Sequence, residues 1–188
     1  MEIKKKNKVF ELFKNYGLYF VVGVIIFAVA LTFTLVATLN NGVEQTGVKN
    51  ISFALPMQNA TVVKDYSDTE LQMNETLNQW EAHMAVDLVS ENTEVYSILD
   101  GTVAKVEYNF LTGYSITINH DDGFCSIYSS LGENTLVKVG DKVGAGQKIG
   151  EISQTSSGEL ELGEHLHLTM LQNDKYVDPN NYLDLQQK

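Results

Sequence analysis

Turn signals recur at short intervals along most of this chain, and they restrict its fold more than any other feature. They stand at Asp100-Gly101, Thr112-Gly113, Asp122-Gly123, Gly140-Asp141 and Ser157-Gly158. Between them lie strand-length runs in which polar and apolar residues alternate, as half-buried strands require. The sequence therefore predicts an all-β domain built on an antiparallel sheet and covering residues 51–188. Residues 71–80 depart from this pattern, and we expect a short helix or a loop there.

The N-terminal part of the chain has a different character. Residues 18–39 form an uncharged, apolar stretch of 22 residues, which is long enough to span a bilayer as one helix. Five lysines and two glutamates precede it, so the positive-inside rule places residues 1–17 in the cytoplasm. We expect a single-pass transmembrane helix, a polar linker at 40–50 and an extracytoplasmic C-terminal domain. A cleavable signal peptide is the alternative, but the apolar run is longer than the usual signal-peptide core and the residues that end it make a poor small-x-small cleavage site.

The charge of the chain excludes one class of partner. The formal net charge is −11, and all thirteen basic residues are lysines. Because nucleic-acid binding depends on positive charge facing the phosphates, we expect none here.

Three histidines and one aspartate are candidates for a metal site. His165 and His167 lie in an alternating run, so both imidazoles would point to the same face of a strand. Zinc is bound by imidazole nitrogens and carboxylate oxygens, and a catalytic zinc has three protein ligands and one water. His83, Asp87 and His167 would supply the three ligands, leaving His165 beside the water. The alternative is that these residues bind no metal. His120 precedes a hairpin signal and is predicted to be a turn residue.

The context of these residues resembles a known family. The segments 101–106, 113–123, 128–131, 139–150 and 177–183 resemble, in order and spacing, the LytM or lysostaphin-like M23 metallopeptidase domain. The resemblance runs from about residue 55 to residue 183. It implies an antiparallel β-sheet fold, zinc as cofactor and peptidoglycan as substrate.

The family's motifs can be placed on this sequence one by one. The motif H-x-G-x-D matches His83 to Asp87 with Ala85 in place of glycine, and the resemblance makes His83 and Asp87 metal ligands. The motif H-x-H makes His167 the third ligand and His165 a catalytic residue. The motif Y-x-H-L reads Tyr-Ser-Ser-Leu here, with Ser130 in place of the catalytic histidine. Loss of one oxyanion donor typically slows turnover by roughly a hundred- to a thousandfold, so we expect impaired catalysis.

The local sequence around 97–103, 111–114 and 128–131 is similar to a sporulation branch of the family. That resemblance implies a forespore membrane protein of the engulfment or channel complex. Its partner would be the ectodomain of a stage III sporulation protein AH-like protein, bound across the intermembrane space. A second reading is an active zinc-dependent peptidoglycan endopeptidase, in which Tyr128 or Ser130 would replace the missing histidine. A third is an activator of a separate wall hydrolase.

Overall fold

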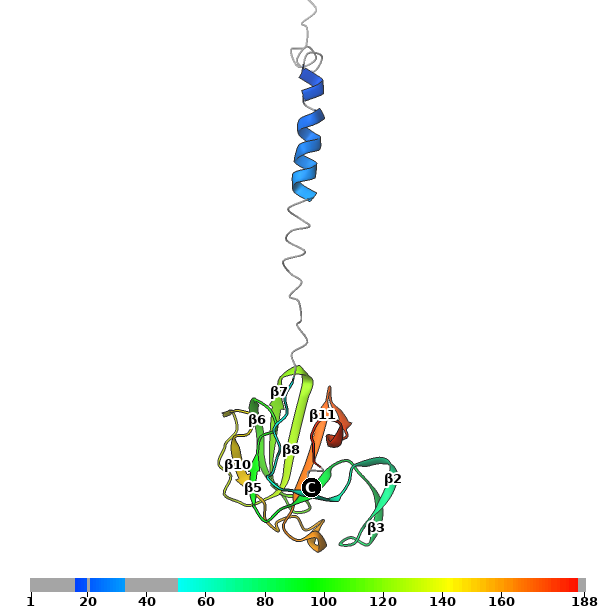
Figure 1. The fold of residues 1–188 in the computed structure, drawn as a ribbon, viewed down its shortest axis with the longest axis vertical. Coiled ribbons are helices and arrows are strands. Elements are labelled where there is room, and N and C mark those ends of the chain that lie inside the picture. Colours follow the sequence, from blue (N-terminus) through cyan, green and yellow to red (C-terminus); the bar gives the residue numbers. More distant parts are fainter. Residues whose placement is uncertain (1–15, 20, 33–50, 186–188) are drawn as a thin grey trace, which may run out of the picture. The chain divides into compact units, whose positions relative to one another are not determined.

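The computed structural model describes residues 16–19, 21–32 and 51–185. The chain divides into two units, Met1–Asn50 and Ile51–Lys188. In the first unit, residues 16–19 and 21–32 are helical (Figure 1). Within the described part of the chain, none of the helices combines the length and apolar character needed to cross a bilayer. The expected transmembrane helix at 18–39 includes residues 20 and 33–39, which lie outside the described residues, as do residues 1–15 of the basic tail and the linker at 40–50.

The second unit is built on one large antiparallel sheet, which confirms the predicted all-β fold. The order of its strands is β1-β4-β11-β8-β7-β6-β9, and β12 pairs with β11. Figure 1 shows β7, β8 and β11 running through the middle of this unit. The strands are β1 (Thr61–Lys64), β4 (Val86–Val89), β6 (Gly101–Asn109), β7 (Gly113–His120), β8 (Phe124–Leu131), β9 (Lys142–Val143), β11 (Leu166–Gln172) and β12 (Lys175–Val177).

Two small sheets complete the unit. One joins β5 (Glu94–Tyr96) to β10 (Lys148–Glu151), and the other is a hairpin of β2 (Ser67–Asn74) and β3 (Gln79–His83). Short 3-10 helices span Asp121–Gly123, Leu160–Leu162 and Pro179–Asn181.

The hairpin corrects the expectation of a helix or loop at 71–80, which was wrong. The side chain of Asn74 accepts a hydrogen bond from Leu77 N at 3.0 Å, and Asn78 has a left-handed φ of 52°. A side chain that bonds to the backbone in this way stabilises a turn in competition with a helix. The local propensity for helix therefore yields to the turn and to pairing between β2 and β3.

The core is packed on the central strands of the large sheet. It contains Ile116 and Ile118 of β7 together with Leu166, Leu168 and Met170 of β11, all 0% exposed. These residues recur at every second position, as strands with one buried face require. The buried face holds the backbone of β4, β8 and β11 in fixed register, and that register positions the polar side chains described below.

Tyr128 combines core packing with one buried hydrogen bond. Its side chain is fully buried, its hydroxyl accepts a hydrogen bond from Ile98 N at 2.8 Å, and burial raises the pKa of the phenol to about 12. We expect Tyr128→Phe to lower the free energy of unfolding by about 1–3 kcal/mol, because the Ile98 N–H would lose its partner. Urea denaturation measures this loss. Tyr108→Phe, at a position 55% exposed, is the matched control and should change stability by less than about 0.5 kcal/mol; equal losses in both variants would contradict the assigned role.

A candidate metal centre

Two neighbouring strands and the end of the hairpin bring the predicted ligands together. Strands β4 and β11 pair in antiparallel register, with His167 directly opposite Asp87. The third residue, His83, is the last residue of β3. Asp87 is 0% exposed and His83 is 3% exposed. Residues 80 positions apart in sequence thus become neighbours through strand pairing.

The distances within this cluster are those of groups that converge on one point. His167 Nδ1 lies 2.8 Å from Asp87 Oδ1, and His83 Nε2 lies 3.2 Å from Asp87 Oδ2. His83 Nε2 and Asp87 Oδ2 are buried without a hydrogen-bond partner. On the other side of its ring, His83 Nδ1 lies 2.9 Å from the carbonyl oxygen of Asp65. That contact requires a proton on Nδ1, and Nε2 is the ring nitrogen that faces the cluster.

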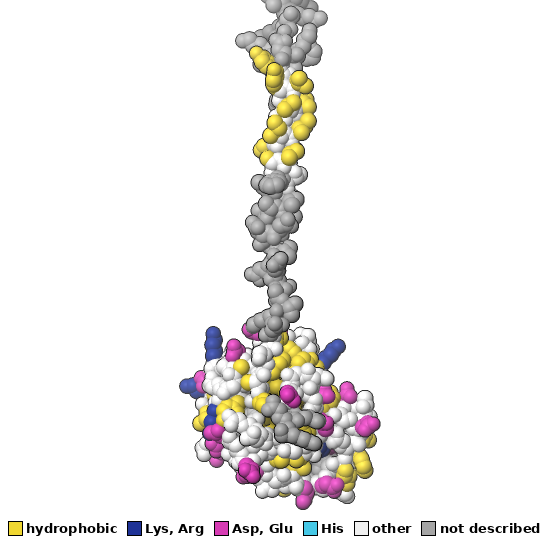
Figure 2. Space-filling model, viewed as in Figure 1, with side chains coloured by type: hydrophobic (Ala, Val, Ile, Leu, Met, Phe, Trp, Pro, Cys, Tyr) yellow, Lys and Arg dark blue, Asp and Glu magenta, His cyan; other side chains and the backbone are white. Residues whose placement is uncertain are grey.

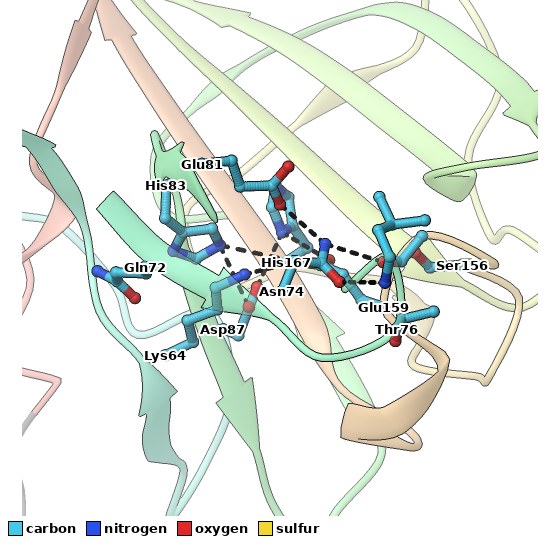
Figure 3. A network of polar contacts seen from close by, with 12 residues as sticks. Lys64, Gln72, Asn74, Thr76, Glu81, His83, Asp87, Ser156, Glu159 and His167 are labelled. Carbon is cyan, nitrogen blue, oxygen red and sulfur yellow. Dashed lines mark hydrogen bonds and ion pairs between the residues drawn. The ribbon is translucent and has the colours of Figure 1, made fainter. Parts of the chain in front are cut away.

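A fourth side chain, Glu159, was missed by the sequence reasoning. It joins His83, Asp87 and His167 in a set whose ligand atoms all lie within 4.8 Å of one another. Its Oε2 lies 3.1 Å from His167 Nδ1, and its Oε1 lies 3.8 Å from His83 Nε2. Figure 3 shows these side chains pointing toward one another from β3, β4, β11 and the loop that follows β10. Glu159 lies in the loop at 156–164, outside the motifs H-x-G-x-D, Y-x-H-L and H-x-H, so no motif in the sequence identifies it as a ligand.

His165 lies beside this group and contacts Glu159. Its Nε2 is 3.4 Å from Glu159 Oε2, and its Nδ1 is 2.9 Å from the carbonyl oxygen of Gly163. His165 is 0% exposed. The structure therefore places all four predicted residues at one site, with His165 reaching the cluster through a carboxylate.

Burial and ion pairing oppose each other in the protonation of this cluster. Burial alone would lower the pKa of His167, but Asp87 and Glu159 raise it to about 10. Burial alone would raise the pKa of both carboxylates, whereas contacts with the histidines lower it below the usual range. Without a metal the cluster thus pairs charged carboxylates with protonated imidazole. A metal ion at this position would displace the extra proton that the His167 imidazole carries.

Three other residues singled out from the sequence have structural roles here. Ser130 is 0% exposed, and its hydroxyl donates to the carbonyl oxygen of Ser153 at 3.0 Å. Tyr128 is occupied by the bond from Ile98 described above. His120 is the last residue of strand β7 and has an extended backbone, so it precedes the turn rather than belonging to it; its ring contacts the carbonyl oxygen of Asp100 and the hydroxyl of Ser126. None of these three joins the cluster.

An antiparallel sheet with His83, Asp87, Glu159 and His167 gathered beside its strands β4 and β11 defines a β-sheet protein with a candidate metal site. The chain belongs to peptidase family M23, because the sequence model of that family matches residues 81–179, more than half of the chain.

The proteins similar to this chain include a sporulation protein and a peptidoglycan endopeptidase. Stage II sporulation protein Q of Bacillus subtilis is 27% identical over 158 residues, which cover 77% of this chain and 55% of that protein. Peptidoglycan DD-endopeptidase ShyC of Vibrio cholerae is 30% identical over 153 residues, covering 79% of this chain and 34% of that protein. A chain in the solved structure of the SpoIIQ–SpoIIIAH pore-forming complex has a TM-score of 0.62 and 26% identity, covering 72% of this chain and 92% of that one. The chain spans about half the length of the first relative and about a third of the second.

Proposed function

We propose that this protein is a membrane-anchored binding scaffold of the M23 fold, which holds zinc but has impaired catalysis. The observation that carries this proposal is Ser130, which stands where the family has a catalytic histidine. Its hydroxyl is buried and donates to Ser153, so it has no free donor to offer a developing oxyanion. Tyr128 cannot take over that role, because its side chain is fully buried in the core, away from the cluster.

The partner we propose is the ectodomain of a SpoIIIAH-like protein. Support comes from the likeness to SpoIIQ, which has been solved in complex with SpoIIIAH. The 22-residue apolar stretch at 18–39 and the preceding lysines support a single-pass anchor with a cytoplasmic N-terminus. The scaffold would then project from the forespore membrane into the intermembrane space. Acidic side chains are spread over the visible face of the β domain in Figure 2, and a surface of this kind favours a partner with basic contacts.

Zinc suits the residues of the cluster. Two buried atoms that lack hydrogen-bond partners, His83 Nε2 and Asp87 Oδ2, face each other, and both belong to the ligand types that zinc prefers. Together with His167 they would hold the ion. Bound there, zinc would supply Lewis acidity and a water of lowered pKa in an open site, or cross-linking of strands in a closed one.

Strand β6 presents the longest unpaired edge of the large sheet among the described residues. Strand β6 pairs with β7 along its length, but β9 covers only Gly101 and Thr102. Val103 is bonded to the loop at 140–141, and among the described residues no strand pairs with the outer edge of 104–109. The other edge strand, β1, has four residues and a register shift between Val62 and Lys64, an irregularity that discourages pairing. We therefore place the partner on the β6 edge, by addition of a strand.

Tyr108 tests this placement. It is 55% exposed on β6, near the exposed Phe110 and Leu111. Tyr108→Asp should weaken binding of the SpoIIIAH-type ectodomain by tenfold or more, because loss of a central interface aromatic costs about 2 kcal/mol. Isothermal titration calorimetry with the full-length chain in mild detergent measures the affinity. Val63→Asp, on the β1 edge, is the matched control and should bind as the unsubstituted chain does.

The results of this experiment distinguish a wrong interface from a wrong partner. If Val63→Asp fails to bind while Tyr108→Asp binds normally, the interface lies on β1 rather than β6. If the unsubstituted chain does not bind the ectodomain at all, the partner itself is wrong. Substitution of His83 by Ala should leave binding unchanged, because the β6 edge and the metal cluster involve different strands.

A second candidate function is an active zinc-dependent peptidoglycan endopeptidase. It is favoured by the retention of His83, Asp87 and His167 in one group with His165 beside it, and by the 30% identity to ShyC. The two functions are distinguished by cleavage of purified peptidoglycan, the first experiment of the Discussion.

A further inference from the structure

We propose that Glu159 is a fourth protein ligand of the metal, which closes the site and takes the position that a catalytic water would need. This inference rests on the zinc binding proposed above and concerns the coordination of the same site. A three-ligand site leaves one position for water, whereas a four-ligand tetrahedral site is structural. The side chains present therefore determine whether a bound zinc can act on a substrate.

The position of the Glu159 carboxylate is the first argument. Its two oxygens lie 3.1 Å from His167 Nδ1, 3.4 Å from His165 Nε2 and 3.8 Å from His83 Nε2. It thus lies between the candidate ligands on one side and His165 on the other. A water activated by both a metal and His165 would have to occupy that same space.

The second argument for Glu159 as a ligand is that hydrogen bonds hold its loop in place on both sides of this residue. Before Glu159, the Ser156 hydroxyl donates to Leu111 O at 2.7 Å and Gly158 N donates to the same oxygen at 3.0 Å. After it, Glu161 N donates to Thr76 Oγ1 at 3.0 Å. A carboxylate on such a loop is held in place rather than free to leave the site.

The hairpin fastens the loop from the other side. Asn74, at the end of β2, is 4% exposed and donates through Nδ2 to Gly158 O at 3.1 Å and to Glu81 Oε1 at 2.8 Å. Figure 3 shows Asn74, Thr76 and Glu81 of the hairpin gathered around Glu159. The hairpin also carries His83 at its end. One element therefore positions both the first ligand and the loop of the fourth.

Charge balance is the third argument. Two neutral imidazoles with one carboxylate leave a divalent ion with a net charge of about +1 in a partly buried site, which is costly. Addition of the Glu159 carboxylate makes the site neutral. Lys64 Nζ lies 3.5 Å from Glu159 Oε1, so the side chain also has a cationic neighbour outside the cluster.

Cobalt substitution tests the closure without reference to activity. The full-length chain is loaded with Co²⁺, its visible spectrum is recorded, and azide is added as a probe for an open coordination position. The unsubstituted chain should show a tetrahedral spectrum that azide leaves unchanged. Glu159→Ala should bind Co²⁺ at least about tenfold more weakly, since even partners outside the ligand set contribute about 10–100-fold, and its spectrum should shift with azide.

Two further variants, Glu161→Ala and Glu159→Gln, serve as controls in the cobalt experiment. Glu161→Ala removes the same charge from an exposed position of the same loop and should behave as the unsubstituted chain does. Glu159→Gln retains the shape of the side chain and should also respond to azide, which covers a failure of the alanine variant to fold. An azide response in the unsubstituted chain would overturn the closure but leave zinc binding intact. A failure to bind Co²⁺ would overturn both, while the partner proposal is tested separately by calorimetry.

Discussion

The double variant Ser130→His with Glu159→Ala should release soluble muropeptides from purified peptidoglycan, whereas the unsubstituted zinc-loaded protein should release none above a blank. The first substitution restores the residue type of the family's third motif, and the second opens a coordination position for water. Against Glu159→Ala alone, the double variant should be faster by roughly a hundred- to a thousandfold, because that is the contribution of one oxyanion donor. Liquid chromatography of the released fragments measures the rate.

The backbone at position 130 accepts a histidine. Ser130 has a φ of 61°, a left-handed conformation in which histidine is enriched relative to most residues. The single variant Ser130→His should remain inactive, since Glu159 still fills the site. The double variant with His167→Ala added is the control and should be inactive. Cleavage by the unsubstituted protein would instead favour the endopeptidase function, and a folded, zinc-loaded double variant that releases nothing would contradict our account of the impaired site.

Zinc should raise the melting temperature of the protein by about 10 °C when its free concentration is about a thousand times the dissociation constant. At that ratio a ligand that binds only the native state contributes about 4 kcal/mol, and each kcal/mol raises the melting temperature by roughly 2–4 °C in domains somewhat larger than this β unit. The effect is large because the ion would join β3, β4, β11 and the loop of Glu159, which are distant in sequence. Differential scanning calorimetry with zinc or with a chelator measures the shift.

Two substitutions show whether this shift comes from the cluster. His83→Ala removes a ligand whose Nε2 is buried and lacks a hydrogen-bond partner, so zinc should then change the melting temperature by no more than a few degrees. Glu161→Ala, on the exposed part of the same loop, should retain the full shift. An equal response to zinc in all three proteins would mean that the ion acts elsewhere.

Periodicity predicted the fold because the signal lies in the residues themselves. Alternating runs such as Leu166–Gln172 and turn signals such as Asp122-Gly123 are local, and they specify strands and hairpins without knowledge of the rest of the chain. The helix or loop expected at 71–80 was wrong for a complementary reason. The helical propensity of those residues was overridden by a turn at residues 75–78, which the bond from Leu77 N to Asn74 stabilises, and by strand pairing, which a local pattern does not contain.

The candidate site was predicted in part. His83, Asp87, His165 and His167 lie in motifs with fixed spacing. The structure brings Asp87 and His167 together by pairing of β4 with β11, and His83 joins them from the end of the hairpin. Glu159 reaches the same point from a loop whose path depends on hydrogen bonds to Leu111 and to the hairpin. Such long-range bonds leave no spacing rule in the sequence. Glu159 is the residue that we infer to close the metal site. Its position near the other ligands is visible only in the folded chain.

The hairpin of β2 and β3 connects the metal cluster to the surface of the protein. It ends in His83, its Asn74 bonds to the loop of Glu159, and its Trp80 and Leu71 are exposed. Thermodynamic linkage makes the effect of such a connection reciprocal. Any molecule that contacts the exposed side of the hairpin and favours its ordered form would tighten zinc binding, and zinc would strengthen that contact by the same factor. An ion bound at the cluster would then influence binding at the hairpin without cutting a bond, independently of the partner on the β6 edge.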